Sequence, residues 1–110
     1  MLDETLESTQ RAGAKVDHAE MLRLKGEMLL MRGQSAQAEA CFRGSLEVAR
    51  VQEAKLWELR TSVSLARLLR DAGRREEART ILAEIYNWFT EGFDTADLKE
   101  AKALLDELSN

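Results

Sequence analysis

The sequence predicts an all-α fold in which antiparallel helical hairpins stack side by side as an α-solenoid. The first observation behind this prediction is an internal repeat, because Gly33 returns 40 residues later as Gly73. Other pairs keep the same order and spacing: Ala38 with Ala78, Phe42 with Leu82, and Ala14-Lys15-Val16 with Ala54-Lys55-Leu56. A fixed period between roughly 20 and 50 residues is typical of stacked repeats, because one unit cannot bury its apolar side without a neighbour.

The second observation is a composition that favours helices. Hydrophobic residues make up 45% of the chain and charged residues 33%, with no proline, which is typical of a folded domain. The strong helix formers Ala, Leu, Glu and Arg are abundant, whereas the aromatic residues that favour strands amount to 5%. At 110 residues the chain has the size of a single domain with a modest core.

The first unit is expected to be a hairpin of two helices, over residues 16–32 and 35–53. Gly33 supplies the left-handed residue that commonly ends a helix, and the Ser35 hydroxyl is placed to cap the next one. The apolar side of the first helix consists of Ala19, Leu22, Gly26, Leu29 and Leu30. That of the second helix consists of Ala38, Cys41, Phe42, Ser45, Leu46 and Ala49.

The second unit repeats this plan over residues 55–72 and 75–90, with Gly73 in the place of Gly33. Its first helix is expected to bury Leu56, Leu59, Val63, Ala66 and Leu69. Its second helix is the most strongly patterned of the chain and is expected to bury Ala78, Ile81, Leu82, Ile85, Trp88 and Phe89. Trp57, at a helix start, is expected to be partly exposed.

A last helix follows Gly92, with Asp94 or Thr95 as its cap and an apolar side made of Leu98, Ala101, Leu104, Leu105 and Leu108. Because Leu6-Glu7 aligns with Leu46-Glu47, the start of the chain is interpreted as the second helix of a preceding repeat. The predicted organisation is a single helical-repeat domain over 1–110: a partial preceding helix in 1–13, repeat 1 in 14–53, repeat 2 in 54–92 and a capping helix in 93–110. The chain is therefore expected to be a fragment of a longer protein.

Small residues on the facing sides of both hairpins resemble the tetratricopeptide repeat. The matching positions are Gly26, Leu29, Gly33, Ala38 and Phe42 in the first unit, and Ala66, Leu69, Gly73, Ala78 and Leu82 in the second. Small side chains let two helix backbones approach, and the bulky residue at 42 or 82 fills the space beside them. The period of 40 departs from the usual value of about 34, the closing proline is absent, and Lys25 and Ser62 replace large apolar residues.

Three stretches resemble more closely the helical repeats near the C-terminus of large bacterial regulators, which join a cyclase-like or DNA-binding domain to an ATPase module. These stretches are Arg23-Leu24-Lys25-Gly26-Glu27-Met28-Leu29-Leu30, Ala38-Glu39-Ala40-Cys41-Phe42-Arg43 and Trp88-Phe89-Thr90-Glu91-Gly92-Phe93-Asp94-Thr95. The resemblance implies a cytoplasmic scaffold that binds proteins in a signalling or transcriptional regulator.

Several functional classes are disfavoured. A net charge of −4 argues against nucleic-acid binding, and no apolar stretch approaches the roughly 20 residues of a membrane span. His18 is the only histidine and is expected to be exposed without a ligand role, because metal sites need three or four convergent ligands. Cys41 lies on an apolar side, where a thiol is inert. We expect no enzyme, metal or cofactor.

The candidate binding residues follow from the repeat architecture. In tetratricopeptide-like stacks the first helix of each pair lines the concave surface, which here would present Glu20, Arg23, Glu27, Leu30, Arg60, Val63, Arg67 and Arg70. Arginine suits the recognition of carboxylates because its planar fork donates two hydrogen bonds at once. We therefore expect a protein or peptide partner, acidic in character. The competing interpretation is an ordinary solvated helix surface with local ion pairs.

The sequence is also compatible with two other functions. The chain is alternatively a structural module for self-association, or for packing against a missing ATPase domain, and Leu2, Leu6, Ala19 and Leu22 would then form the apolar surface of a homodimer. A small helical enzyme is the remoter alternative, because no nucleophile is paired with a base.

Overall fold

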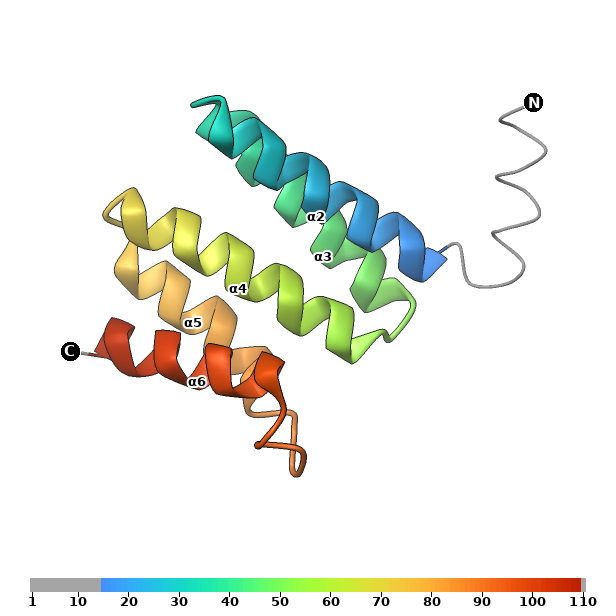
Figure 1. Cartoon of the computed structure of the whole chain (residues 1–110), viewed down its shortest axis with the longest axis vertical. Helices are drawn as coiled ribbons and strands as arrows, with labels where there is room; N and C mark the ends of the chain where they lie inside the picture. Colours follow the sequence, from blue (N-terminus) through green and yellow to red (C-terminus); the bar gives the residue numbers. More distant parts are fainter. Residues whose placement is uncertain (1–14, 110) are drawn as a thin grey trace.

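The computed structural model describes residues 15–109, which fold into helices joined by short turns. The helices are α2 (Lys15–Met31), α3 (Ser35–Val51), α4 (Lys55–Asp71), α5 (Arg75–Tyr86) and α6 (Ala96–Ser109). Helices α2 and α3 form one antiparallel hairpin, α4 and α5 form the next, and α6 packs beside the second (Figure 1). The all-α prediction is confirmed. The helix expected in residues 1–13 lies outside the described residues.

The two predicted hairpin bends have the same backbone geometry. Gly33 has a φ of 78° and Gly73 a φ of 81°, a conformation in which a side chain would be strained. The N–H of Gln34 donates to the Leu29 carbonyl at 2.9 Å, and that of Arg74 donates to the Leu69 carbonyl at 2.8 Å. These bonds satisfy helix-end carbonyls in the glycine-dependent manner expected at such ends. Gly33 and Gly73 therefore stand at equivalent bends of successive hairpins, as the repeat predicts.

Helix α4 is the centre of the stack, because it contacts α2, α3, α5 and α6. Its burial reflects this position, with Leu59, Leu65, Ala66 and Leu69 fully buried. Helix α4 contacts both α2 and α6, so the three helices lie next to one another in the order α2, α4, α6. Figure 1 shows these three helices side by side, running across the molecule. The first helices of successive hairpins thus form one continuous face, which we call the first-helix face.

Within the first hairpin, α2 and α3 approach closely at Gly26. A Cβ atom built on Gly26 would lie only 2.5 Å from Cε1 of the fully buried Phe42. This contact agrees with the prediction that Gly26 and Ala38 let the two helix backbones approach while Phe42 fills the space beside them. Ala38, Leu46 and Ala49 of α3 are buried as expected.

Several predictions at helix ends are wrong. Helix α5 ends at Tyr86 instead of residue 90, and the chain then turns so that the ring of Phe93 lies 5.7 Å from that of Tyr86. Trp88 therefore lies outside the helix and is 55% exposed, with Lys55 over its ring. Leu56, in the first turn of α4, is 44% exposed and not part of the core.

The predicted caps have mixed outcomes. Ser35 is the first residue of α3 and not its cap; the cap position is Gln34, whose side chain makes no capping bond. Thr95 does cap α6, since its hydroxyl accepts the N–H of Leu98 at 3.4 Å. In the bend between α3 and α4, Glu53 has a φ of 57°, which is a left-handed conformation. The sequence did not predict this conformation, because the position is not a glycine.

Candidate interaction surface

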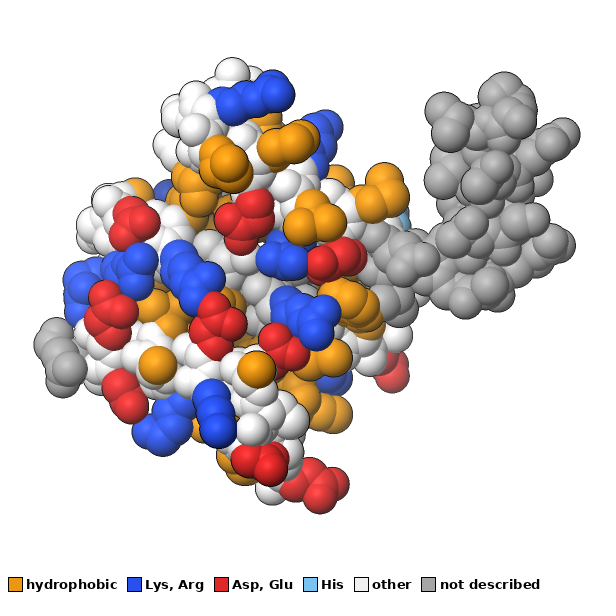
Figure 2. Space-filling model, in the orientation of Figure 1, with side chains coloured by type: hydrophobic (Ala, Val, Ile, Leu, Met, Phe, Trp, Pro, Cys, Tyr) orange, Lys and Arg blue, Asp and Glu red, His pale blue; other side chains and the backbone are white. Residues whose placement is uncertain are grey.

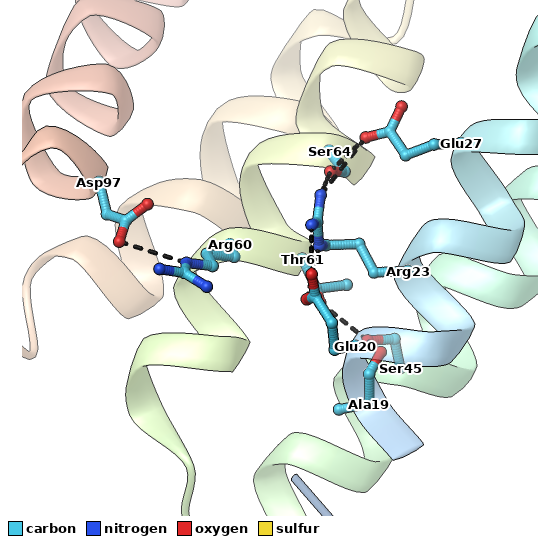
Figure 3. Close-up of polar contacts among 9 residues, drawn as sticks. All are labelled: Ala19, Glu20, Arg23, Glu27, Ser45, Arg60, Thr61, Ser64 and Asp97. Carbon is cyan, nitrogen blue, oxygen red and sulfur yellow. Dashed lines mark hydrogen bonds and ion pairs between the residues drawn. The ribbon is translucent and has the colours of Figure 1, made fainter. Parts of the chain in front are cut away.

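The α2 portion of the first-helix face is a polar cluster centred on Arg23. Its guanidinium donates to both carboxylate oxygens of Glu20, at 3.0 and 2.6 Å, and this bidentate contact raises the pKa of Arg23. Ser64 of α4 donates to Glu27 at 2.7 Å and accepts a longer contact from Arg23 at 3.5 Å. Figure 3 shows these side chains meeting in the gap between α2 and α4. The cluster joins two neighbouring repeats through their first helices.

The arginines of α4 face the other way, toward α6. Arg60 Nε donates to Asp97 at 3.2 Å, and Arg70 Nη1 lies 3.1 Å from Glu107. Between them, Arg67 is paired with Glu100. Figure 2 shows the resulting mixture of basic and acidic side chains over α4 and α6. The four arginines expected on the concave surface, Arg23, Arg60, Arg67 and Arg70, are thus all paired with carboxylates of the chain itself.

A cleft of about 210 Å³ opens among these charges. Its lining combines apolar groups with arginines and carboxylates: Arg23, Leu59, Arg60, Val63, Ser64, Arg67, Asp97 and Glu100. Four of the eight residues predicted to bind a partner therefore line one cleft. Leu30 does not; it lines a second cleft, of about 380 Å³, at the hairpin ends beside Leu68 and Arg74.

The carboxylates of α6 were not among the predicted site residues. Glu100 and Glu107 are 47% and 54% exposed, and each also contacts an arginine of α4. A signal was present in the sequence, since Arg60 and Asp97 are 37 residues apart, as are Arg70 and Glu107. The Ser64 to Glu27 bond has the same separation, so neighbouring first helices share one register.

Buried hydroxyls support this face from beneath. Ser45 of α3 donates to the Ala19 carbonyl of α2 at 2.6 Å, and its oxygen lies 2.8 Å from Thr61 Oγ1 of α4. Because the Ser45 proton is used on Ala19, Thr61 is the donor in the second bond. All three residues are almost completely buried (Figure 3). This chain of bonds fixes three helices relative to one another below the polar cluster.

Other candidate groups offer no chemistry on this surface. His18 is exposed, as predicted, and Cys41 is half-buried. Within residues 15–109, no three side chains of the metal-binding types come together in a group that could hold an ion. No helix in that range has the length and apolar character of a membrane span. Ala19, proposed for a dimer surface, is fully buried, so that assignment is wrong.

A second ion-pair cluster lies on the opposite layer, between α3 and α5. Arg43 donates to Glu39 at 2.9 Å and to Glu77 at 2.7 Å, and Arg74 contacts the same two carboxylates at 2.9 and 3.0 Å. Hydrogen bonds from Arg74 and Arg43 lower the pKa of Glu39, and bonds from Arg43 and Arg74 lower that of Glu77. We call these four residues the outer quartet.

The fold defines an α-solenoid of helical hairpins in which the first helices of successive pairs lie side by side. The tetratricopeptide repeat family matches residues 17–91, which is more than half of the chain. The chain therefore belongs to the tetratricopeptide repeat family, whose members generally mediate interactions between proteins and are typically not catalytic. Searches of curated proteins and of solved structures gave no significant match.

Proposed function

We propose that this protein is a non-catalytic scaffold that binds an acidic peptide or protein segment on the first-helix face. The observation that supports this most is the cleft between α2, α4 and α6, which is lined by Arg23, Arg60 and Arg67 together with the carboxylates of Asp97 and Glu100. The carboxylates of an acidic segment can bind these arginines in place of the internal ones.

The internal ion pairs do not prevent such binding. Arg67 and Glu100 are 43% and 47% exposed. Exposed pairs of this kind contribute only about 0–1 kcal/mol. A carboxylate from a partner can therefore displace Glu100 from Arg67 at little cost. The internal carboxylates therefore compete with those of a partner for the same guanidinium groups.

Because of this competition, two substitutions should change the affinity for an acidic peptide in opposite directions. We expect Arg67→Gln to weaken binding of a fluorescein-labelled peptide of alternating Glu and Leu residues, because it removes the anchor. Glu100→Gln should strengthen binding of the same peptide, because it frees Arg67. Fluorescence anisotropy measures both affinities, and the expected changes are about threefold or more in each direction.

Arg79→Gln is the matched control, since Arg79 forms an exposed pair with Glu76 on α5, away from the first-helix face. This variant should leave peptide affinity unchanged. A peptide that does not bind, or Arg67→Gln and Glu100→Gln variants that shift affinity in the same direction, would remove the basis of the proposal.

The proposed organisation keeps residues 14–53 and 54–92 as the two repeats, and 93–110 as a helix packed on the second repeat. The pairing of α6 with α4 through Asp97, Glu100 and Glu107 supports this place for the last helix. The resemblance to the C-terminal repeats of bacterial regulators supports placing the scaffold in a cytoplasmic signalling or transcriptional regulator. Expression of the chain beside a separately expressed ATPase module of such a regulator, followed by co-purification, tests that placement.

A further inference from the structure

Helix α2 carries an exposed apolar row on the side that faces away from α3. Met21, Leu24 and Met28 are 60%, 52% and 52% exposed, and Met31 at the end of the helix is 85% exposed. Figure 2 shows hydrophobic side chains along the edge of the molecule formed by α2. The opposite side of the helix is already used, because Ala19 and Gly26 pack inside the first hairpin. Helix α2 is therefore apolar on both sides.

The repeat explains what this row is for. Forty residues after Met21, Leu24 and Met28 stand Thr61, Ser64 and Leu68 of α4, which are 1%, 4% and 5% exposed, whereas Asp71, the counterpart of Met31, is exposed. In these buried positions Thr61 is hydrogen-bonded to Ser45 of α3, and Ser64 to Glu27 of α2. A further 40 residues on, the positions are Ala101, Leu104 and Leu108 of α6, again all buried. The row is the stacking side of a first helix, covered in α4 and α6 and open in α2.

The spacing of the row matches the seam of a coiled coil. Its members, Met21, Leu24, Met28 and Met31, are separated by three, four and three residues, which are the a and d positions of two heptads. Residues 19 and 26 then fall at f positions, on the far side of the seam, where they pack inside the first hairpin. A second helix can therefore lie along the row without displacing α3.

Charges beside the row identify the occupant as a second α2. One flank, the g positions, carries Glu20 and Glu27, and the other flank, the e positions, carries Lys25 and Arg32. Glu20 already binds Arg23 and Glu27 accepts a bond from Ser64 within one copy, but a carboxylate has further acceptor positions for a cation of the partner. In a parallel pair each g residue meets the e residue of the next heptad in its partner, so that Glu20 meets Lys25 and Glu27 meets Arg32. An antiparallel pair would place like charges together. Within residues 15–109, Lys25 and Arg32 have no ion-pair partner.

Head-to-tail stacking between copies is disfavoured by the other end of the molecule. The outer side of α6 carries exposed charges at Lys99, Lys102 and Asp106, which offer no apolar row to match that of α2. A symmetric contact in which α2 meets α2 also closes after two copies, whereas a head-to-tail contact would extend into filaments.

We propose that two copies of this chain associate through a parallel coiled-coil contact between their α2 helices, with Met21, Leu24, Met28 and Met31 at its centre. Two heptads bury less area than a stable dimer interface, so the dissociation constant should be on the order of 10–100 µM. None of the four seam residues lines the cleft beside Arg67, so Leu24→Lys should weaken dimerisation without changing peptide binding.

Sedimentation equilibrium from low micromolar to millimolar protein tests this proposal. We expect a monomer–dimer equilibrium that Leu24→Lys weakens at least about tenfold, because it places two like charges in the seam. Val51→Lys is the matched control: Val51 is 72% exposed at the end of α3 and should have no effect. The far-ultraviolet circular dichroism of both variants should match that of the unmodified chain, since both positions are exposed in one copy.

A cross-linking experiment tests the direction of the pair. In a Cys41→Ser background, Leu24→Cys should form a disulfide dimer on mild oxidation, because a parallel register sets the two copies of position 24 opposite each other. Val51→Cys should not. A chain that stays monomeric throughout the concentration range, a dimer insensitive to Leu24→Lys, or a Met21→Cys chain that cross-links only to a Met31→Cys chain would each overturn the proposal.

Discussion

A methyl group at position 26 would stand 2.5 Å from Cε1 of Phe42, closer than two carbon atoms can pack. Phe42 is fully buried and surrounded by the core of the first hairpin, so its ring has little room to withdraw. This contact sets the distance between α2 and α3, and α2 supplies the Arg23 cluster of the first-helix face. The position of the candidate binding surface therefore depends on the packing of Gly26 against the ring of Phe42.

Gly26→Ala should destabilise the protein. Alanine is the better helix former by about 1 kcal/mol, but overpacking of a core costs about 1–3 kcal/mol, so a net loss of about 1 kcal/mol is expected. Urea denaturation measures the change. Gly44→Ala is the matched control, because its only close neighbour is Leu22 Cδ1 at an ordinary 3.7 Å, and it should stabilise the chain. Equal effects of the two substitutions would contradict the packing argument.

Glu53→Gly should stabilise the protein by about 0.5–1 kcal/mol. Glu53 holds a φ of 57°, where a Cβ atom is unfavourable and glycine is not. Its bend has the bonding pattern of the glycine bends, since the Ala54 N–H donates to the Ala49 carbonyl at 2.8 Å. Gly73→Ala is the converse change and should destabilise. A lower midpoint of thermal unfolding for Glu53→Gly would show that its side chain is needed.

Ser45→Ala should cost more stability than Thr61→Val. The first substitution leaves the buried Thr61 hydroxyl without its acceptor, which costs about 1–3 kcal/mol. The second replaces the donor by an apolar group of the same shape and keeps the bond from Ser45 to Ala19. Chemical denaturation of both single variants and of the double variant measures the coupling. Additive effects would mean that the two hydroxyls act independently.

Stability should fall in acid through the outer quartet. The pKa values of Glu39 and Glu77 are lowered from the ordinary value of 4.5 by their arginine partners, so the unfolded chain binds protons more tightly than the folded one. This contribution is present above pH 4.5 and is lost as the pH falls through the lowered values. The free energy of unfolding, measured from neutral pH downward, should decline less steeply in Glu39→Gln. An unchanged slope would exclude Glu39 as a source of the acid sensitivity.

Much of the fold could be predicted from local pattern. The equivalence of Gly33 and Gly73 was visible as a repeat, and the pairing of Gly26 with Phe42 followed from small and large residues at matched positions. The position of Trp88 could not be predicted, because its apolar spacing continues the pattern of a helix that in the structure already ends at Tyr86. The partners of Arg60, Arg67 and Arg70 also escaped prediction, since they lie on a helix more than 30 residues away.

The sequence by itself determined the all-helical architecture, the hairpin bends and the repeat that relates α2 to α4, because periodicity and backbone preference act within a few residues. Only the tertiary structure decided that the α4 arginines are met by α6 carboxylates, and that Met21, Leu24 and Met28 are exposed while their counterparts in α4 and α6 are buried. These features depend on which helix lies beside which. The spacing of residues within one helix does not record whether a neighbouring hairpin covers a given side of it.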